Sequence, residues 1–277
     1  MDRIVGFLGR RNLLKSMGIA GVSYAATVAC TSSTTPTAAV PAANSTAANS
    51  TATNCPSSEV PVGIAKRPAA KDLSPDDALK LVMDGNQRFV DGKTFHPRSG
   101  KETVIQTGAD QFPFAAFLGC ADSRVPIETV FDQGIGDCFV CRVAGNIASP
   151  ETVGSLEFGT LVLGSKLILV MGHRSCGAVV AAMGRLDEPS VDLKDLGMIP
   201  SLVPYLTPAV KEIEEKVKKE GIAKVPNDLE ATIKANAKIQ AAALAKSSIL
   251  SKLVATGKLK ILPAYYDITS GKVSLLT

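Results

Sequence analysis

The sequence contains no Trp, and Phe and Tyr together account for only 5% of its 277 residues. Its charge is nearly balanced, with 30 Lys and Arg against 26 Asp and Glu, and the basic residues are spread along the chain. A nucleic-acid-binding surface usually combines a basic patch with aromatic side chains that stack on bases. The composition therefore argues against a nucleic-acid partner.

The sequence also has too few cysteines to suggest that disulfides hold the fold together. It has six Cys, and 45% of its residues are hydrophobic, which is enough for a substantial core. We expect one domain over residues 71–277. It is preceded by a signal segment at 1–29 and a flexible linker at 30–70.

The segment at 1–29 resembles an export signal. Arg10 and Arg11 begin a stretch similar to a twin-arginine motif, and the weakly apolar run at 17–29 is too short to span a bilayer comfortably. A disordered or amphipathic start is the alternative interpretation. We expect an exported, periplasmic protein.

Two features near residue 30, where the signal segment meets the linker, bear on whether a lipid anchors the protein to a membrane. Residues 27–30 partly match a lipoprotein box, with Thr27 where Leu is usual, so the sequence leaves acylation of Cys30 open. The tract at 31–58 is rich in Ser, Thr, Ala, Pro and Asn and has too little apolar surface to pack. A lipid on Cys30 would therefore tether the domain to a membrane through a flexible linker.

Four short apolar runs predict buried strands, and helical patterns separate them. The predicted strands are residues 112–118, 137–143, 166–171 and 259–268, the last of these being the final strand. The predicted helices are 74–89, 127–131, 151–163, 176–183, 207–221 (capped by Thr207 and Pro208), 227–247 and 249–256. Strands that alternate with helices favour parallel pairing. The sequence thus predicts an α/β fold with a mostly parallel central β-sheet flanked by helices, in a single domain.

Metal-ligand side chains follow two of the predicted strands. Cys120 follows residues 112–118 after a single glycine, and His173 and Cys176 come after residues 166–171. The carboxyl ends of strands in an α/β sheet are where ligand-binding groups collect. Two Cys and one His are a zinc donor set that leaves the fourth coordination position open, as in catalytic sites. Cys176 is also the first residue of a predicted helix, whose N-terminus favours the thiolate form.

Other Cys and His residues have simpler interpretations. Cys138 and Cys141 have CxxC spacing, but residues three apart in a strand point to opposite faces, so we expect buried, inert thiols. His96 lies in a polar, Gly-rich connection and is expected to be an exposed loop residue. Cys55 lies in the linker and is expected to be an incidental or intermolecular thiol.

The motifs CADSRVP at 120–126 and GHRSCGAV at 172–179 resemble those of the β-class carbonic anhydrases. The resemblance runs from about residue 74 to 276. It implies a zinc enzyme that reversibly hydrates carbon dioxide to bicarbonate and a proton by means of zinc-bound hydroxide, with one Zn²⁺ per subunit. Asp122 matches the aspartate that orients the hydroxide, and Arg124 matches the arginine that holds this aspartate. In the family, an aspartate that its arginine releases takes the fourth zinc position and closes the site.

The resemblance extends to three substrate-binding residues. Gln111 matches an amide that donates to the substrate, often across a dimer interface, and Phe139 and Phe158 match aromatics that line the carbon dioxide pocket. A solvated loop amide and two core phenylalanines are the alternatives. The implied assembly is a homodimer or a higher even oligomer.

Two other functions stay open at this point. The same fold also supports hydrolysis of carbonyl sulfide or carbon disulfide. A binding module with a vestigial, zinc-stabilised site is the third hypothesis, against which the presence of Asp122, Arg124 and all three ligands argues.

Overall fold

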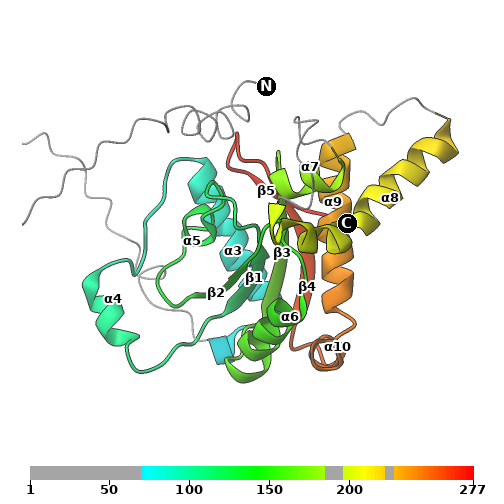
Figure 1. The fold of residues 1–277 in the computed structure, drawn as a ribbon. Helices are drawn as coiled ribbons and strands as arrows, with labels where there is room; N and C mark the ends of the chain where they lie inside the picture. Colours follow the sequence, from blue (N-terminus) through cyan, green and yellow to red (C-terminus); the bar gives the residue numbers. More distant parts are fainter. Residues whose placement is uncertain (1–69, 185–195, 222–227) are drawn as a thin grey trace, which may run out of the picture. The chain divides into compact units, whose positions relative to one another are not determined.

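The computed structural model describes residues 70–184, 196–221 and 228–277 (Figure 1). The predicted export signal, the linker up to residue 69 and the acylation of Cys30 lie outside these residues. Within the described ranges, no helix has both the length and the apolar character needed to cross a membrane.

The described residues form one five-stranded sheet in the order β2-β1-β3-β4-β5. The strands are β1 (Ala115–Gly119), β2 (Cys138–Arg142), β3 (Leu167–His173), β4 (Lys260–Tyr266) and β5 (Val273–Leu275). The first four pair in parallel and β5 pairs antiparallel to β4, which confirms the predicted α/β fold with a mostly parallel sheet. The prediction that the strand at 259–268 is the last is wrong. Three residues suffice for β5 because β4 supplies its hydrogen-bond partners.

Helices connect and cover the strands. They are α3 (Pro75–Val90), α4 (Lys101–Gln106), α5 (Ile127–Val130), α6 (Pro150–Glu157), α7 (Gly177–Ala182), α8 (Val203–Glu220), α9 (Asp228–Leu244) and α10 (Ser248–Ala255), with short turns η1 (Ala70–Asp72), η2 (Phe158–Val162, a π-helix) and η4 (Ile199–Leu202). The sequence analysis did not predict α4. It also predicted one continuous helix at 151–163, where α6 changes to the wider π-helix of η2.

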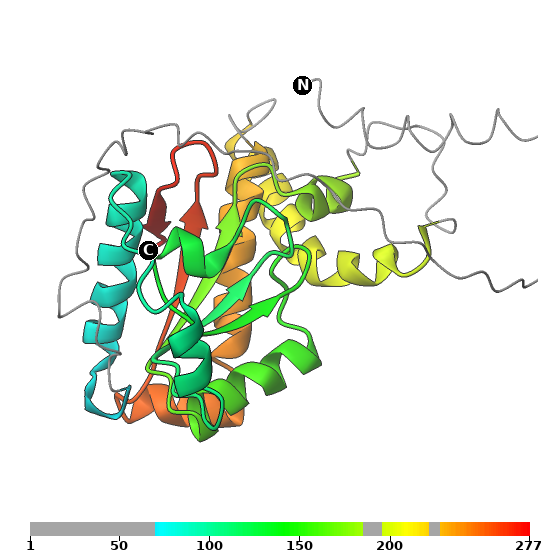
Figure 2. The ribbon, with the colours of Figure 1, turned by 90° about the vertical axis from the view of Figure 1, so that its left-hand side faces the viewer.

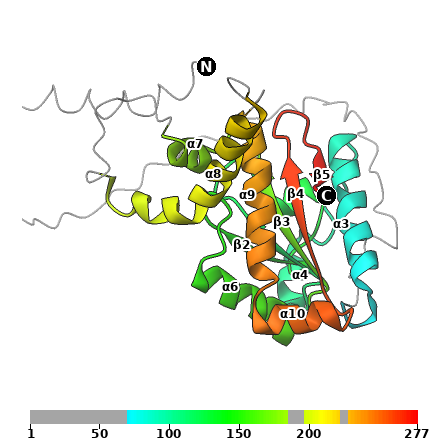
Figure 3. The same cartoon turned by 90° about the vertical axis from the view of Figure 1, so that its right-hand side faces the viewer.

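Each face of the sheet packs against its own set of helices. Alternate residues of the strands point to opposite faces, so Phe117, Leu169 and Met171 join the core on the α3 side. Their neighbours Leu118 and Val170 join the core that α6, α9 and α10 cover. Figures 2 and 3 show α3 and α9 on opposite sides of the sheet. Full burial of each such side chain contributes about 1.5–3 kcal/mol.

The start of α3 follows the sequence signals closely. Ser74 caps the helix, its hydroxyl accepts from the Asp77 N–H, and the Asp77 carboxylate accepts from the Ser74 N–H. Gly85 lets this helix approach α5, because a Cβ there would lie 1.8 Å from the Phe131 carbonyl oxygen. The helix therefore packs closely against the rest of the domain.

The predicted start of α8 at Thr207 is wrong, and its predicted end is right. The helix begins at Val203, so Pro204 occupies the first turn, where a missing N–H breaks no helical hydrogen bond, and Pro208 lies inside the helix. Gly221 ends the helix with φ at 64°, in the left-handed region.

Candidate metal centre

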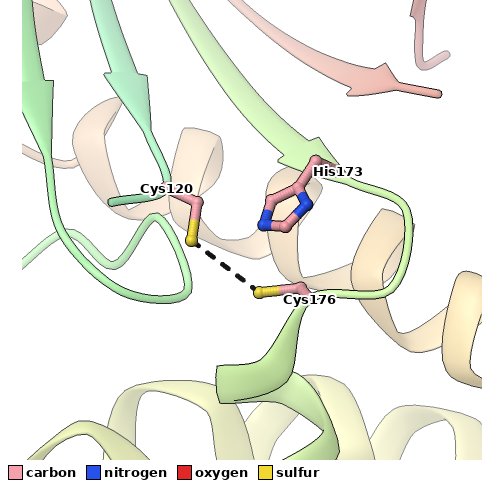
Figure 4. Close-up of side chains that lie close together, drawn as sticks. All are labelled: Cys120, His173 and Cys176. Atoms are coloured by element: carbon pink, nitrogen blue, oxygen red, sulfur yellow. Dashed lines mark hydrogen bonds between the residues drawn. The ribbon is translucent and has the colours of Figure 1, made fainter. Parts of the chain in front are cut away.

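The three predicted metal ligands lie together at the carboxyl end of the sheet. Strands β1 and β3 pair in parallel, with Leu118 opposite Val170, so the chain leaves both strands at the same edge. Cys120 follows β1, His173 ends β3, and Cys176 caps α7. One ligand atom from each residue lies within 4.8 Å of the others, and the two sulfur atoms are 3.9 Å apart (Figure 4).

A tight turn brings His173 and Cys176 to the same point. Ser175, between them, has φ of 56°, a left-handed conformation that is uncommon for a residue with a side chain. Nδ1 of His173 lies 3.0 Å from the Arg174 carbonyl oxygen, so Nδ1 carries the proton and donates to it. The lone pair of Nε2 therefore faces the two sulfurs. Nε2 is buried and has no hydrogen-bond partner among the described residues.

The two sulfur atoms share a proton, and a bound cation would stabilise both of them as thiolates. The hydrogen bond from the Cys176 thiol, assisted by one from the Gly145 N–H at 3.4 Å, lowers the pKa of Cys120. The same sulfur–sulfur hydrogen bond, together with burial, raises the pKa of Cys176. Two thiolates at this distance repel each other unless a positive charge lies between them. A divalent cation would supply that charge and replace the shared proton.

These observations fit zinc. Two thiols and an imidazole are borderline-soft donors, they are buried, they are not joined by a disulfide, and the imidazole nitrogen that faces them lacks a partner in the described part of the chain. Three protein ligands leave the fourth position for water or substrate. The arrangement can therefore activate a water molecule.

Asp122 and Arg124 lie beside the three donors. The Arg124 guanidinium donates to both carboxylate oxygens of Asp122, from Nε at 2.9 Å and from Nη2 at 2.7 Å, and the Arg124 N–H adds a third hydrogen bond at 2.9 Å. The hydrogen bond from Arg124 lowers the pKa of Asp122 to about 2. The Asp122 carboxylate is therefore ionised at neutral pH, with Oδ2 3.8 Å from Nε2 of His173.

Arg142 holds the loop that carries Cys120 and was not predicted from the sequence. Arg142 ends β2, and its guanidinium donates to the Cys120 carbonyl at 2.9 Å and to the Asp122 carbonyl at 2.6 Å. The signal was available, because Arg142 lies near the carboxyl end of the predicted strand at 137–143, and this end lies at the same edge of the sheet. No local motif distinguishes it from a surface Arg.

The three predicted substrate-binding residues lie away from the donors of their own chain. Gln111 is exposed and precedes β1, whose five residues span about 16 Å between it and Cys120. Phe139 and Phe158 contact each other, with ring centroids 6.4 Å apart, and Phe158 is 47% exposed. The apolar residues that pack around the sulfurs are different ones: Ile147, Val179, Leu206, Ile233 and Tyr265.

The predicted separation of Cys138 and Cys141 and the predicted exposure of His96 agree with the structure, and Cys55 lies outside the described residues. Cys138 packs in the core on the α3 side and Cys141 in the core on the opposite face, so the two thiols cannot meet. Both are half-buried rather than fully buried, and burial raises the pKa of each. His96 is exposed, as predicted.

A parallel α/β sheet that presents a buried Cys₂His set next to a carboxylate held by a guanidinium defines a zinc-dependent enzyme. The sequence profile described as carbonic anhydrase matches residues 115–273. The chain is 34% identical over 207 residues to carbonic anhydrase 2 of Mycobacterium tuberculosis, covering 74% of this chain and 94% of that protein. It is 37% identical over 203 residues to the carbonic anhydrase of Mycolicibacterium smegmatis, covering 73% and 93%.

Solved structures agree with this assignment. The β-carbonic anhydrase CafA of Aspergillus fumigatus superimposes with a TM-score of 0.53 at 25% identity, covering 63% of this chain and 80% of that one. The fold of the tetrameric β-carbonic anhydrases of Sordaria macrospora matches with a TM-score of 0.53 at 23% identity, covering 63% and 89%. The chain belongs to the carbonic anhydrase family, in its β class, the zinc lyases that hydrate carbon dioxide.

Proposed function

We propose that Cys120, His173 and Cys176 hold one zinc ion per chain and that carbon dioxide is hydrated to bicarbonate beside them, with Asp122 and Arg124 as the catalytic pair. The observation that carries the proposal is the convergence of three buried donor atoms within 4.8 Å, at the carboxyl ends of two adjacent parallel strands. Zinc bound by these donors would lower the pKa of a coordinated water towards about 7 and so supply a nucleophile near neutral pH.

Asp122 orients the water. Its carboxylate is ionised and lies next to the donors, so it accepts a hydrogen bond from the water and points an oxygen lone pair at the carbon of carbon dioxide. Attack by that oxygen would form a new C–O bond while one C=O π bond of carbon dioxide opens onto its own oxygen, and the water would give up one proton to solvent, leaving bicarbonate. Arg124 keeps both carboxylate oxygens of Asp122 in hydrogen bonds, which holds the carboxylate away from the fourth ligand position.

A metal-loading assay tests this proposal. The purified protein should contain one zinc per chain and accelerate carbon dioxide hydration in a stopped-flow indicator assay. A chelator should abolish the activity and added zinc should restore it. Cys120→Ser should lose zinc and activity together, while Cys138→Ser, a substitution at a half-buried thiol away from the donors, should lose neither. Full activity in the metal-stripped protein would contradict the proposal, and carbonyl sulfide in the same assay tests the alternative substrate.

We also propose that two chains pair through the surface formed by α4, the segment before β1 and η2. Exposed apolar side chains gather there: Val104, Ile105, Phe112, Phe158, Leu161 and Val162. Gln111 and Phe112 line a hollow of about 460 Å³ on this surface, together with Val162 and Leu163. Contiguous exposed apolar side chains favour association. A partner chain would cover this surface and bring its own Gln111 and phenylalanines towards the other chain's site.

A charge placed on this surface tests the pairing. Leu161→Glu should convert the dimer to a monomer in sedimentation velocity, and Val254→Glu, at an exposed apolar position on α10, should not. Equal sedimentation of Leu161→Glu and the parent protein would contradict the proposed interface.

The proposed location is the periplasm, on the strength of Arg10, Arg11 and the apolar segment at 17–29. Replacing both arginines by Lys should keep the protein in the cytoplasmic fraction. Radiolabelled palmitate should label the exported protein at Cys30 if a lipid tethers it, and Cys30→Ser should remove the label. Export that is unaffected by the double Lys variant would contradict the twin-arginine route.

A further inference from the structure

A buried chain of amide side chains connects α9 to the loop beside Cys120. Asn236 and Gln240 lie one turn apart on α9 and are 0% and 3% exposed. Gln240 Nε2 donates to Asn236 Oδ1 at 3.0 Å, and Asn236 Nδ2 donates to the Gly145 carbonyl at 2.9 Å. The N–H of that same Gly145 donates to the Cys120 sulfur at 3.4 Å. The amides thus reach the metal ligand through a single residue.

The loop is held at more than one point. The Ala148 N–H donates to Gln240 Oε1 at 2.9 Å, and Gln240 Nε2 also donates to the Tyr205 carbonyl on α8 at 2.9 Å. Gly145 itself has φ of 78° and lies so close to Leu206 that a Cβ there would be 3.0 Å from Cδ2. The loop has little freedom to move while these hydrogen bonds are made.

The same helix also fixes the strand that carries His173. A Cβ on Gly172 would lie 2.9 Å from Cγ2 and 3.1 Å from the carbonyl oxygen of Ile233, so α9 packs directly against β3 at the residue before the imidazole. Both halves of the donor set, Cys120 through the loop and His173 through β3, are therefore positioned by one helix.

Burying amides in place of apolar side chains is unfavourable unless every hydrogen bond is made. The amide hydrogen bonds of Asn236 and Gln240 run to the 145–148 loop, to α8 and to each other. Their effect is therefore to set the position of the loop rather than to stabilise α9 alone. No functional residue was predicted from the sequence in the helix at 227–247.

We infer that Asn236, braced by Gln240, is a positioning residue for zinc binding, because it holds the Gly145 N–H against the Cys120 sulfur. This inference rests on the zinc site proposed above. Outer hydrogen bonds to a metal ligand typically change metal affinity 10- to 100-fold. Loss of the Asn236 amide should therefore weaken zinc binding without removing any ligand.

Asn236→Leu and a matched control, Thr232→Val, test the inference in the full chain. Thr232 lies one turn before Asn236 on α9, is 1% exposed, and donates its hydroxyl to the Asp228 carbonyl of its own helix at 2.7 Å. Both substitutions remove a buried hydrogen bond, but only Asn236→Leu releases the loop. The measurements are the Kd for zinc, by competition with a chromophoric chelator, the sulfur-to-metal absorption band of the cobalt-loaded protein, and Tm without metal.

Asn236→Leu should raise the Kd for zinc about 10- to 100-fold and shift the cobalt absorption band. Thr232→Val should lower Tm and leave both the Kd and the band as in the parent protein. The inference is overturned if Asn236→Leu binds zinc with an unchanged Kd, or if Thr232→Val weakens binding by the same factor. If Asn236→Leu does not fold, Gln240→Met replaces it. This variant keeps the Asn236–Gly145 hydrogen bond and removes the hydrogen bonds of Gln240 to Asn236, Ala148 and Tyr205. Its Kd for zinc should rise by less than that of Asn236→Leu, and an unchanged Kd overturns the inference.

These outcomes separate the inference from the proposed function. A parent protein that binds no zinc overturns both. A parent protein that binds one zinc, with variants that bind it equally well, overturns only the role of α9.

Discussion

The molecule uses the same Asp–Arg pair in two very different settings. Asp132 pairs with Arg88, which lies 44 residues away in sequence, and its carboxylate is 0% exposed. Asp122 pairs with Arg124, two residues away, and the Arg124 side chain is 51% exposed. The first pair links two segments that are far apart in the sequence. The second pair lies within three consecutive residues and links no separate segments. Chemistry alone therefore does not tell a structural ion pair from a functional one.

The surroundings of the two carboxylates explain the difference. Asp132 also accepts the N–H groups of Phe95 and His96, so it fixes the loop that follows α3. Asp122 accepts only from Arg124 among the hydrogen bonds described for its carboxylate, and it faces the donors of the metal centre. A half-exposed Arg can leave its partner at little cost, whereas a buried one cannot.

The largest effect is expected from breaking the buried pair. Asp132→Ala leaves the Arg88 guanidinium and two backbone N–H groups without their acceptor, and should lower the unfolding free energy by about 3–5 kcal/mol in urea denaturation. Asp84→Ala, which breaks an exposed pair with Lys80 on α3, is the control and should change stability by less than about 1 kcal/mol. A similar loss of unfolding free energy in Asp132→Ala and Asp84→Ala would mean that burial does not determine how much an ion pair contributes to stability.

Breaking the exposed pair should affect activity and leave the fold intact. Arg124→Ala frees the Asp122 carboxylate to occupy the fourth zinc position, so kcat/KM for carbon dioxide should fall about 10- to 100-fold across the pH range, while the unfolding free energy changes by less than about 1 kcal/mol. Arg174→Ala, at a half-exposed arginine near the site that pairs with Asp267, is the control. An unaltered rate in Arg124→Ala would rule out the proposed role of this pair.

Arg142 is an intermediate case and sharpens the comparison. It is charged, but its partners are the carbonyl oxygens of Cys120 and Asp122 rather than a carboxylate. Arg142→Met should lower stability by about 1–2 kcal/mol through two lost hydrogen bonds, and should weaken zinc binding through the displaced loop. Calorimetry and zinc competition measure the two effects. If Arg142→Met lowers stability but leaves the Kd for zinc unchanged, the role of Arg142 is structural, like that of the Asp132–Arg88 pair.

Much of the fold could be predicted because its signals are local. The capping box at Ser74, the glycine that ends α8 and the four apolar runs each act within a few residues, and the structure contains the corresponding elements. Errors occurred where the signal depends on a distant neighbour. Strand β5 exists because β4 lies next to it. The error at the start of α8 is different in kind, because Pro208 gives the same local signal as Pro204, which occupies the first turn.

The sequence by itself determined the strand ends and the residue types at them, and hence a Cys₂His donor set and an adjacent Asp–Arg pair. Parallel pairing makes this possible, because it places the carboxyl ends of successive strands at one edge of the sheet. Only the tertiary structure decided what holds those donors in place: the Arg142 guanidinium on two carbonyls and the amides of α9 on the Gly145 turn. These hydrogen bonds join side chains to backbone groups up to 91 residues away in the sequence. Every residue has a backbone carbonyl, so the sequence does not indicate which carbonyl a given side chain binds.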